Sequence, residues 1–200
     1  TLNIKMSYDG LQIVPAPVAD DKTLPDKMNI DLSLNKLPFK ALMGLGQQSL
    51  QMTASAPQEG VAKLAMLQAL MTAPQLLTQS QTNLTIRNTF IGNPLYNVAL
   101  DAAVLADLKA QMSATGTATL KIRGMDMLVD AIKTKMDNPT TPAEAKARMQ
   151  KTLETMTIMQ IASTKQNDTD GNTVHVYNFE LGADGKILLN GTDMSALLNR

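Results

Sequence analysis

Few residues of this chain have types suited to catalysis, and His175 comes first because it is the only histidine. It alternates with Tyr177, Phe179 and Leu181, a pattern that predicts a strand with these four side chains on one face. A hydrolase would need a serine presented beside this imidazole, and the chain has no G-x-S-x-G turn. We therefore expect a non-catalytic protein in which His175 has a structural partner. A hydrolase that uses His175 is the alternative.

Metal and cofactor chemistry also has little support in the residue types. The chain has no cysteine, which removes thiolate ligands, disulfides and cysteine nucleophiles. Residues 168–172 resemble the start of a calcium loop, but no glycine follows the third ligand position and Phe179 stands where the last acid belongs. Gly44 and Gly46 form a lone G-x-G, and Asp126, Asp130 and Asp137 have the spacing of a solvated helix face. We predict no metal and no cofactor.

The 14 methionines are the strongest compositional bias, and aromatic residues make up only 3% of the chain. Methionine is flexible and fills irregular gaps, so a Met-packed core is one interpretation and an adaptable apolar groove is another. In the second case the predicted helices would line the groove with Met125, Leu128, Met149, Leu153 and Met156. Thioether ligation of Cu(I) by residues such as Met125 and Met156 is a further alternative, and helical packing explains their spacing better.

A strand, a polar turn and an amphipathic stretch follow one another three times in the chain. The copies occupy residues 30–42, 118–129 and 186–197, with corresponding bends at Lys36, Gly124 and Gly191. Their spacing is uneven, so they cannot stack as a regular solenoid. We interpret them as strand-to-helix corners of one domain.

The remaining patterns predict the elements that connect these corners. Alternation predicts strands at 2–6, 11–14, 84–86, 96–105, 111–123, 173–181 and 186–189, and helical spacing predicts helices at 58–79, 125–136 and from 141 onward. Pro74 should kink or divide the first helix, Thr141 and Glu144 should form a capping box, and Asp193 should cap a last helix at 194–198. These patterns predict a single α+β domain over residues 1–200, with a curved antiparallel sheet and helices packed on one face.

Charge and hydropathy exclude several kinds of partner. The chain has 18 basic and 18 acidic side chains, with no basic cluster suited to nucleic acid or anionic headgroups. The longest apolar run is far shorter than the ~20 residues of a membrane-spanning helix. Because the chain begins at Thr1 inside an alternating strand, we expect a fragment of a longer protein.

Two segments resemble known bacterial envelope proteins. Residues 30–38 are similar to a strand followed by an Asn-x-Leu-Pro phrase in uncharacterised envelope proteins, and residues 177–191 resemble the closing hairpin of the YdgA-like family. The style of hairpins that end in short helices is also similar to AsmA-like proteins, which form β-grooves implicated in lipid movement. The resemblance implies an exported, periplasmic or envelope protein and supplies no catalytic residues.

Two functional hypotheses follow. The first is a non-catalytic envelope domain that binds a lipid or another apolar ligand between the sheet and the helices. The alternative is a structural or protein-interaction module of a larger periplasmic protein, which would use exposed strand edges to bind an envelope partner.

Overall fold

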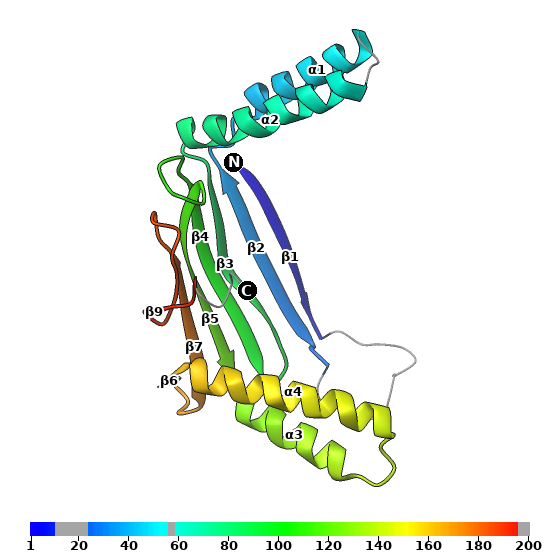
Figure 1. Ribbon diagram of the computed structural model, residues 1–200. Helices are drawn as coiled ribbons and strands as arrows, with labels where there is room; N and C mark the ends of the chain where they lie inside the picture. Colours follow the sequence, from blue (N-terminus) through cyan, green and yellow to red (C-terminus); the bar gives the residue numbers. More distant parts are fainter. Residues whose placement is uncertain (11–23, 56–58, 196–200) are drawn as a thin grey trace.

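The computed structural model of the protein describes residues 1–10, 24–55 and 59–195 (Figure 1). In these ranges the strands are β1 (Leu2–Asp9), β2 (Lys27–Asn35), β3 (Asn83–Gly92), β4 (Asn97–Ala106), β5 (Ala114–Arg123), β6 (Thr164–Asn167), β7 (Thr173–Leu181), β8 (Ile187–Leu189) and β9 (Thr192–Asp193). The helices are α1 (Phe39–Ser55), α2 (Glu59–Gln79), α3 (Met125–Asp137) and α4 (Ala143–Ala162). This is the α+β class that the sequence predicts.

The strands of the described ranges form one open antiparallel sheet. Their order is β1-β2-β3-β4-β5-β7-β8-β9, and β6 pairs with the first half of β7. Strands β3, β4 and β5 are joined directly, whereas a helical pair is inserted between β2 and β3 and another between β5 and β6. The sheet therefore forms the continuous body from which the helices extend.

The register of the sheet separates apolar from polar side chains. Paired residues share a face and successive residues alternate between faces, so the pairing defines two surfaces. The apolar face carries Leu2, Ile4, Met6, Met28, Ile30, Leu32, Leu34, Leu84, Ile86, Ile91, Val98, Leu100, Ala102, Val104, Ala118, Leu120, Ile122, His175, Tyr177, Phe179, Leu181, Ile187 and Leu189. The opposite surface, here called the threonine face, carries Ser33, Thr85, Asp101, Thr115, Thr117, Thr119, Asn178 and Glu180.

The helices form two hairpins at opposite ends of the sheet (Figure 1). The α1–α2 hairpin follows the C-terminal end of β2, and the α3–α4 hairpin follows the C-terminal end of β5. β5 is three strands away from β2 in the antiparallel sheet, so the two strands run in opposite directions. Their C-terminal ends therefore lie at opposite ends of the sheet along the strand direction. Both hairpins project to the same side and leave the middle of the strands between them (Figure 1).

The three bends predicted from the repeated phrase are corresponding bends in the structure. Lys36 has φ 54°, Gly124 has φ 78° and Gly191 has φ 82°, so all three adopt the left-handed conformation. The first two lead into α1 and α3, as expected. After Gly191 the chain forms β9, and the predicted helix at 194–198 lies largely outside the described residues, as does the predicted strand at 11–14.

Two local predictions need correction. Of the two outcomes expected at Pro74, a division of the helix does not occur, because α2 runs on to Gln79 with Pro74 inside it. Thr141 does not cap α4, because the helix begins after Pro142 without a side-chain cap and the Thr141 hydroxyl donates instead to the Lys135 carbonyl at 2.7 Å. The sequence analysis also missed β6, whose four exposed residues have no apolar alternation to reveal a strand.

Gly124, which links β5 to α3, permits a close approach to the turn between β3 and β4. A Cβ atom at this position would collide with the carbonyl oxygen of Leu95, and it would lie 3.0 Å from the Cα of Tyr96. Gly171 has a similar φ of 82° but has nothing within 4 Å of its Cβ position. A comparison of alanine substitutions at the two glycines therefore separates the free-energy cost of a left-handed backbone from the cost of a steric collision.

We expect Gly124→Ala to destabilise the protein more than Gly171→Ala does. The left-handed conformation should cost each variant ~1–2 kcal/mol, and the collision should add about 1–3 kcal/mol to Gly124→Ala alone. Urea unfolding followed by circular dichroism measures both free energies. Equal losses in the two variants would contradict the close approach at Gly124.

Candidate functional site

His175 is the centre of a polar cluster that joins three elements, here called the His175 junction. Its side chain from β7 is fully buried, and Nδ1 lies 2.7 Å from Oγ of Ser163, the residue that ends α4. Nε2 faces Oδ1 of Asp126 on α3 at 3.7 Å, and that oxygen accepts a hydrogen bond from the Gln160 side chain. The Ser163 hydroxyl is also within 2.8 Å of the Gln160 carbonyl.

The junction brings together serine, histidine and aspartate, which are the residue types of a hydrolytic triad. Its geometry suits attachment better than catalysis. The imidazole has no exposed surface for a substrate to reach, and the separation of Nε2 from Asp126 exceeds hydrogen-bond distance. We infer that the junction fastens the first turn of α3 and the last turn of α4 to β7. The sequence identified His175 but gave no sign of Ser163 or Gln160, which approach it only in the folded chain.

A small apolar core lies next to the junction. Ile122, Met125 and Tyr177 are buried together, and Met159 of α4 packs against them. The Tyr177 hydroxyl donates to the Met159 carbonyl at 2.8 Å, and burial raises the pKa of this phenol above its ordinary value. The Tyr177 hydroxyl therefore stays protonated at neutral pH and holds α4 against the sheet.

The residues predicted to line an apolar site all lie on the α3–α4 hairpin. Met125 is part of the buried core, and the other four are half-buried along the two helices: Leu128 on α3, and Met149, Leu153 and Met156 on α4. The hairpin thus brings the set together. The cavity on the threonine face, described below, is not lined by these side chains.

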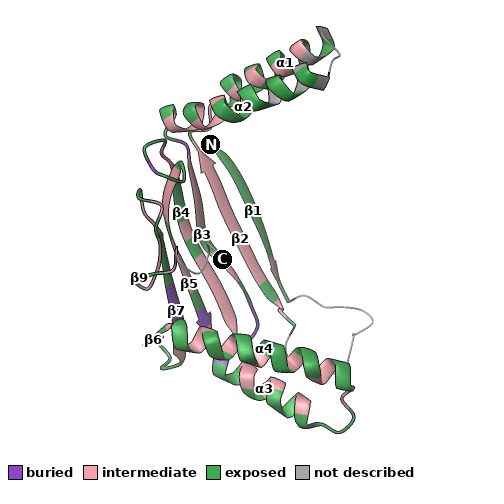
Figure 2. Cartoon of the chain, in the orientation of Figure 1, coloured by how far each residue is buried: buried purple, intermediate pink, exposed green. Residues whose placement is uncertain are grey.

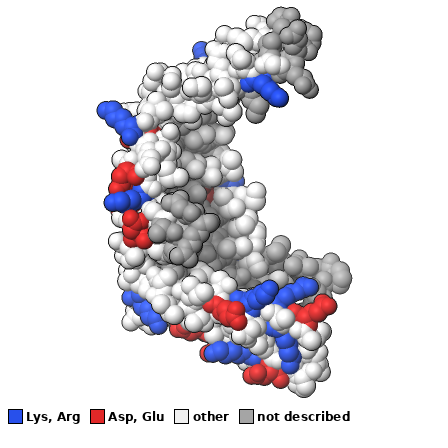
Figure 3. All heavy atoms as spheres, in the orientation of Figure 1, with Lys and Arg blue, Asp and Glu red and all other residues white. Residues whose placement is uncertain are grey.

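Away from the hairpins, the apolar face retains considerable exposure. Leu2, Ile4 and Met6 on β1 are 53%, 48% and 56% exposed. Val104 and Phe179 are also more than one-third exposed, and β2 between them and β1 is half-buried (Figure 2). The molecule is hollowed on the side between the two hairpins (Figure 3). This combination of exposed apolar side chains and a hollow is the main binding geometry among the described residues.

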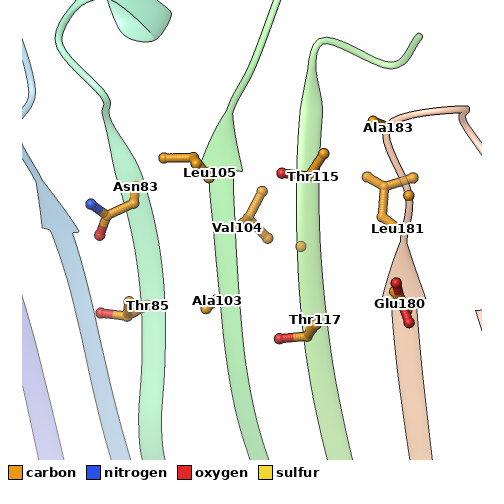
Figure 4. A pocket seen from close by; sticks show the side chains of 12 residues that line it. Asn83, Thr85, Ala103, Val104, Leu105, Thr115, Thr117, Glu180, Leu181 and Ala183 are labelled. Atoms are coloured by element: carbon orange, nitrogen blue, oxygen red, sulfur yellow. The ribbon is translucent and has the colours of Figure 1, made fainter. Parts of the chain in front are cut away.

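The threonine face carries a shallower depression at the edge next to the α1–α2 hairpin. A cavity of about 510 Å³ is lined by side chains from β3, β4, β5 and β7 (Figure 4). Thr85, Thr117 and Glu180 supply its polar groups, whereas Leu105 and Leu181 supply apolar ones. Glu180 is its only ionisable side chain, so the depression lacks the pair of groups that acid–base catalysis requires.

The segment that resembles a calcium loop is a turn closed by its own aspartate. Asp168 accepts hydrogen bonds from the amides of Asp170 and Asn172 at 3.0 and 2.8 Å, and Arg123 lies 3.9 Å away. Although desolvation opposes the shift, these contacts lower the pKa of Asp168. Among the residues that the structure describes, no group of three or more acidic or histidine side chains is placed to hold a metal ion.

None of the helices in the described ranges combines the length and the apolar character needed to cross a bilayer. No protein-family model, curated protein or solved structure matches the chain.

The His175 junction predicts strong coupling between Ser163 and His175. Ser163→Ala should leave Nδ1 of a buried imidazole without a partner, at a cost of about 1–3 kcal/mol. His175→Phe should cost a similar amount, because it fills the volume but removes the hydrogen bond to Ser163, whose hydroxyl then keeps only the Gln160 carbonyl as a partner. The double variant should cost about 0.5–3 kcal/mol less than the sum, as measured by urea unfolding. Additive losses would show that the two residues do not act together.

Proposed function

We propose that this protein is a non-catalytic domain of the bacterial envelope that binds a lipid acyl chain or a similar apolar ligand on its apolar face, between the two helical hairpins. The observation that carries the proposal is the exposure of apolar side chains on that face. Large exposed apolar surfaces usually mark binding sites for lipids, other apolar ligands or partners. Such a site needs no catalytic group.

The dimensions of the sheet suit an extended apolar ligand. Strands β3, β4 and β5 each have 10 residues and span about 33 Å. One leaflet of a bilayer is about 15 Å deep in hydrocarbon, so an acyl chain lying along the strands fits within their length. Ala102 and Ala118 are paired in the middle of the face, where their small side chains leave room above the sheet.

The chemistry of the face supports an uncharged ligand. The residues given above for this face include no carboxylate, lysine or arginine, and their one histidine, His175, is buried in the junction. The resemblance of residues 177–191 to the YdgA-like closing hairpin, and of the general style to AsmA-like β-grooves, supports an envelope protein that handles lipid. The methionines and leucines of the α3–α4 hairpin would then border the ligand at one end.

Ala102 and Ala103 offer a matched test because they are adjacent but lie on opposite faces of β4. After delipidation with organic solvent, the wild-type protein should bind a fluorescent fatty acid in titration. Ala102→Lys should weaken binding at least tenfold, since it places an ammonium group in an apolar site at a cost of ~1.4 kcal/mol or more. Ala103→Lys should bind as the wild type does.

Native mass spectrometry of the undelipidated protein supplies a second measurement. We expect lipid to co-purify with the wild type and with Ala103→Lys, and to be depleted in Ala102→Lys. Phe179→Gln, a milder change on the same face, should weaken binding without a risk to folding. Equal binding by all variants would place the ligand elsewhere, and an absence of binding by the wild type would contradict the proposal.

A second candidate function, as a protein-interaction module, is favoured by the edge strand β1. Among the described strands, β1 pairs only with β2, so its other edge offers eight residues of backbone for strand addition. A strand added there would extend both the ladder and the apolar face. Its side chains would cover the exposed Ile4 and Met6.

Lysine on an exposed edge hinders strand addition, so the candidate predicts the effect of Ile4→Lys with Met6→Lys. If β1 recruits a strand of another copy, the wild type should associate as its concentration rises and this double variant should remain monomeric. Light scattering after size exclusion measures the mass. Asn3→Lys with Ser7→Lys, on the opposite face of the same strand, separates loss of the apolar contact from a general effect of charge. A wild type that stays monomeric at all concentrations would contradict self-association through β1.

A further inference from the structure

The two helical hairpins are similar in size but differ sharply in charge. Residues 39–79, which span the α1–α2 hairpin, contain only Lys40, Glu59 and Lys63 as charged side chains. Residues 125–162, which span the α3–α4 hairpin, contain ten: Asp126, Asp130, Lys133, Lys135, Asp137, Glu144, Lys146, Arg148, Lys151 and Glu154. In Figure 3 the upper arm is correspondingly almost free of coloured atoms, whereas the lower arm is densely coloured.

The α1–α2 hairpin also exposes large apolar side chains in ordered stripes. On α1, Phe39, Met43 and Leu50 fall within about 40° of one another around the helix axis. On α2, the exposed residues Leu64, Leu67, Leu70 and Met71 fall within about 120°. Their exposed fractions lie between 50% and 72%. An apolar stripe of this kind normally faces a core, but these stripes face solvent.

We propose that the α1–α2 hairpin docks on the surface of a lipid bilayer by inserting these apolar stripes. A bilayer is the occupant that the chemistry favours, because the other exposed residues described on the hairpin are mainly Gln, Gly and Ala, with Lys40 and Lys63 as the charged ones. The Gln side chains form hydrogen bonds at the headgroup level without requiring a charged partner. Helices that combine bulky apolar residues with an uncharged polar face bind membranes through packing defects in the lipid.

The position of the hairpin is compatible with this role. The hairpin extends away from the end of the sheet, and its main contact with the strands is that of α2 with β4 (Figure 1). A flat surface can therefore approach the far part of α1 and α2 without meeting the sheet. With two lysines against one glutamate, the hairpin has almost no electrostatic attraction to anionic lipid.

Vesicle flotation tests the proposal. The protein should float with small phosphatidylcholine vesicles, and it should float less with large ones, whose lipids have fewer packing defects. Added salt or anionic lipid should change binding little, because the contact is not electrostatic. Leu64→Gln with Leu67→Gln should lower the fraction bound by at least tenfold, since two leucines lose their apolar insertion.

The α3–α4 hairpin supplies a matched control. Ile158 and Ile161 are 68% and 81% exposed, so Ile158→Gln with Ile161→Gln removes the same kind of exposed apolar surface from a charged hairpin. This variant should float as the wild type does. Ala102→Lys should also float normally, which keeps membrane docking separate from ligand binding on the apolar face. Circular dichroism checks that each variant is folded.

Four results would overturn the proposal. The first two are a wild type that does not float with vesicles and a Leu64/Leu67 variant that floats as well as the wild type. The third is flotation that requires anionic lipid and disappears at high salt. The fourth is an equal loss of flotation in the Leu64/Leu67 and Ile158/Ile161 variants. Sedimentation without vesicles distinguishes a further case. If the wild type is a dimer and the Leu64/Leu67 variant a monomer, the stripe is a contact between copies of the chain, and the bilayer proposal fails.

Discussion

The facing of the antiparallel ladder, which keeps apolar side chains on one side of the sheet, is the constraint on which the rest of the structure depends. From β1 to β7 every pairing keeps apolar residues opposite apolar ones, such as Ile4 with Leu32, Leu100 with Leu120, and Leu120 with Tyr177. A slip of one residue in any strand would move its apolar side chains to the threonine face. The register shift within β3 avoids this outcome, because the extra residue at Arg87 and Asn88 forms a bulge. The pairing resumes with Thr89 opposite Leu100, which returns Ile91 to the apolar face opposite Val98.

The same ladder determines where the helices lie. The helical hairpins follow β2 and β5, whose C-terminal ends lie at opposite ends of the sheet. Each hairpin therefore borders one end of the apolar face. The α3–α4 hairpin is attached firmly, through the His175 junction, the buried Met125 and the hydrogen bond from Tyr177 to the Met159 carbonyl. The α1–α2 hairpin meets the sheet chiefly where α2 contacts β4. The face between them is bordered by helices at its ends and is uncovered by helices in its middle.

Much of this arrangement could be predicted from the sequence, because it follows from local patterns. Strict alternation predicted β5 and β7, and the bends at Lys36, Gly124 and Gly191 were recognised from their polar and glycine residues. The His175 junction could not be predicted, since Ser163 and Gln160 reach the imidazole only when α4 folds back over β7. The capping box predicted at Thr141 does not form, because its hydroxyl donates to the Lys135 carbonyl instead of accepting from an amide in the first turn of α4. The predicted lining residues lie on one hairpin, and whether they border a ligand remains a prediction.

Buried and exposed apolar side chains differ in how much they contribute to the stability of the fold. Met125 and Ile122 stabilise the structure because they are buried, at about 25 cal/mol for each Å² of apolar surface removed from water. Leu64 and Leu50, at 71% and 72% exposed, contribute little of this energy, and a glutamine at either position would satisfy the helix equally well. Their apolar character therefore serves no evident purpose within the folded chain. The same reasoning applies to Leu2, Ile4 and Met6, and the exposure of these side chains is the observation on which both proposals of apolar contact depend.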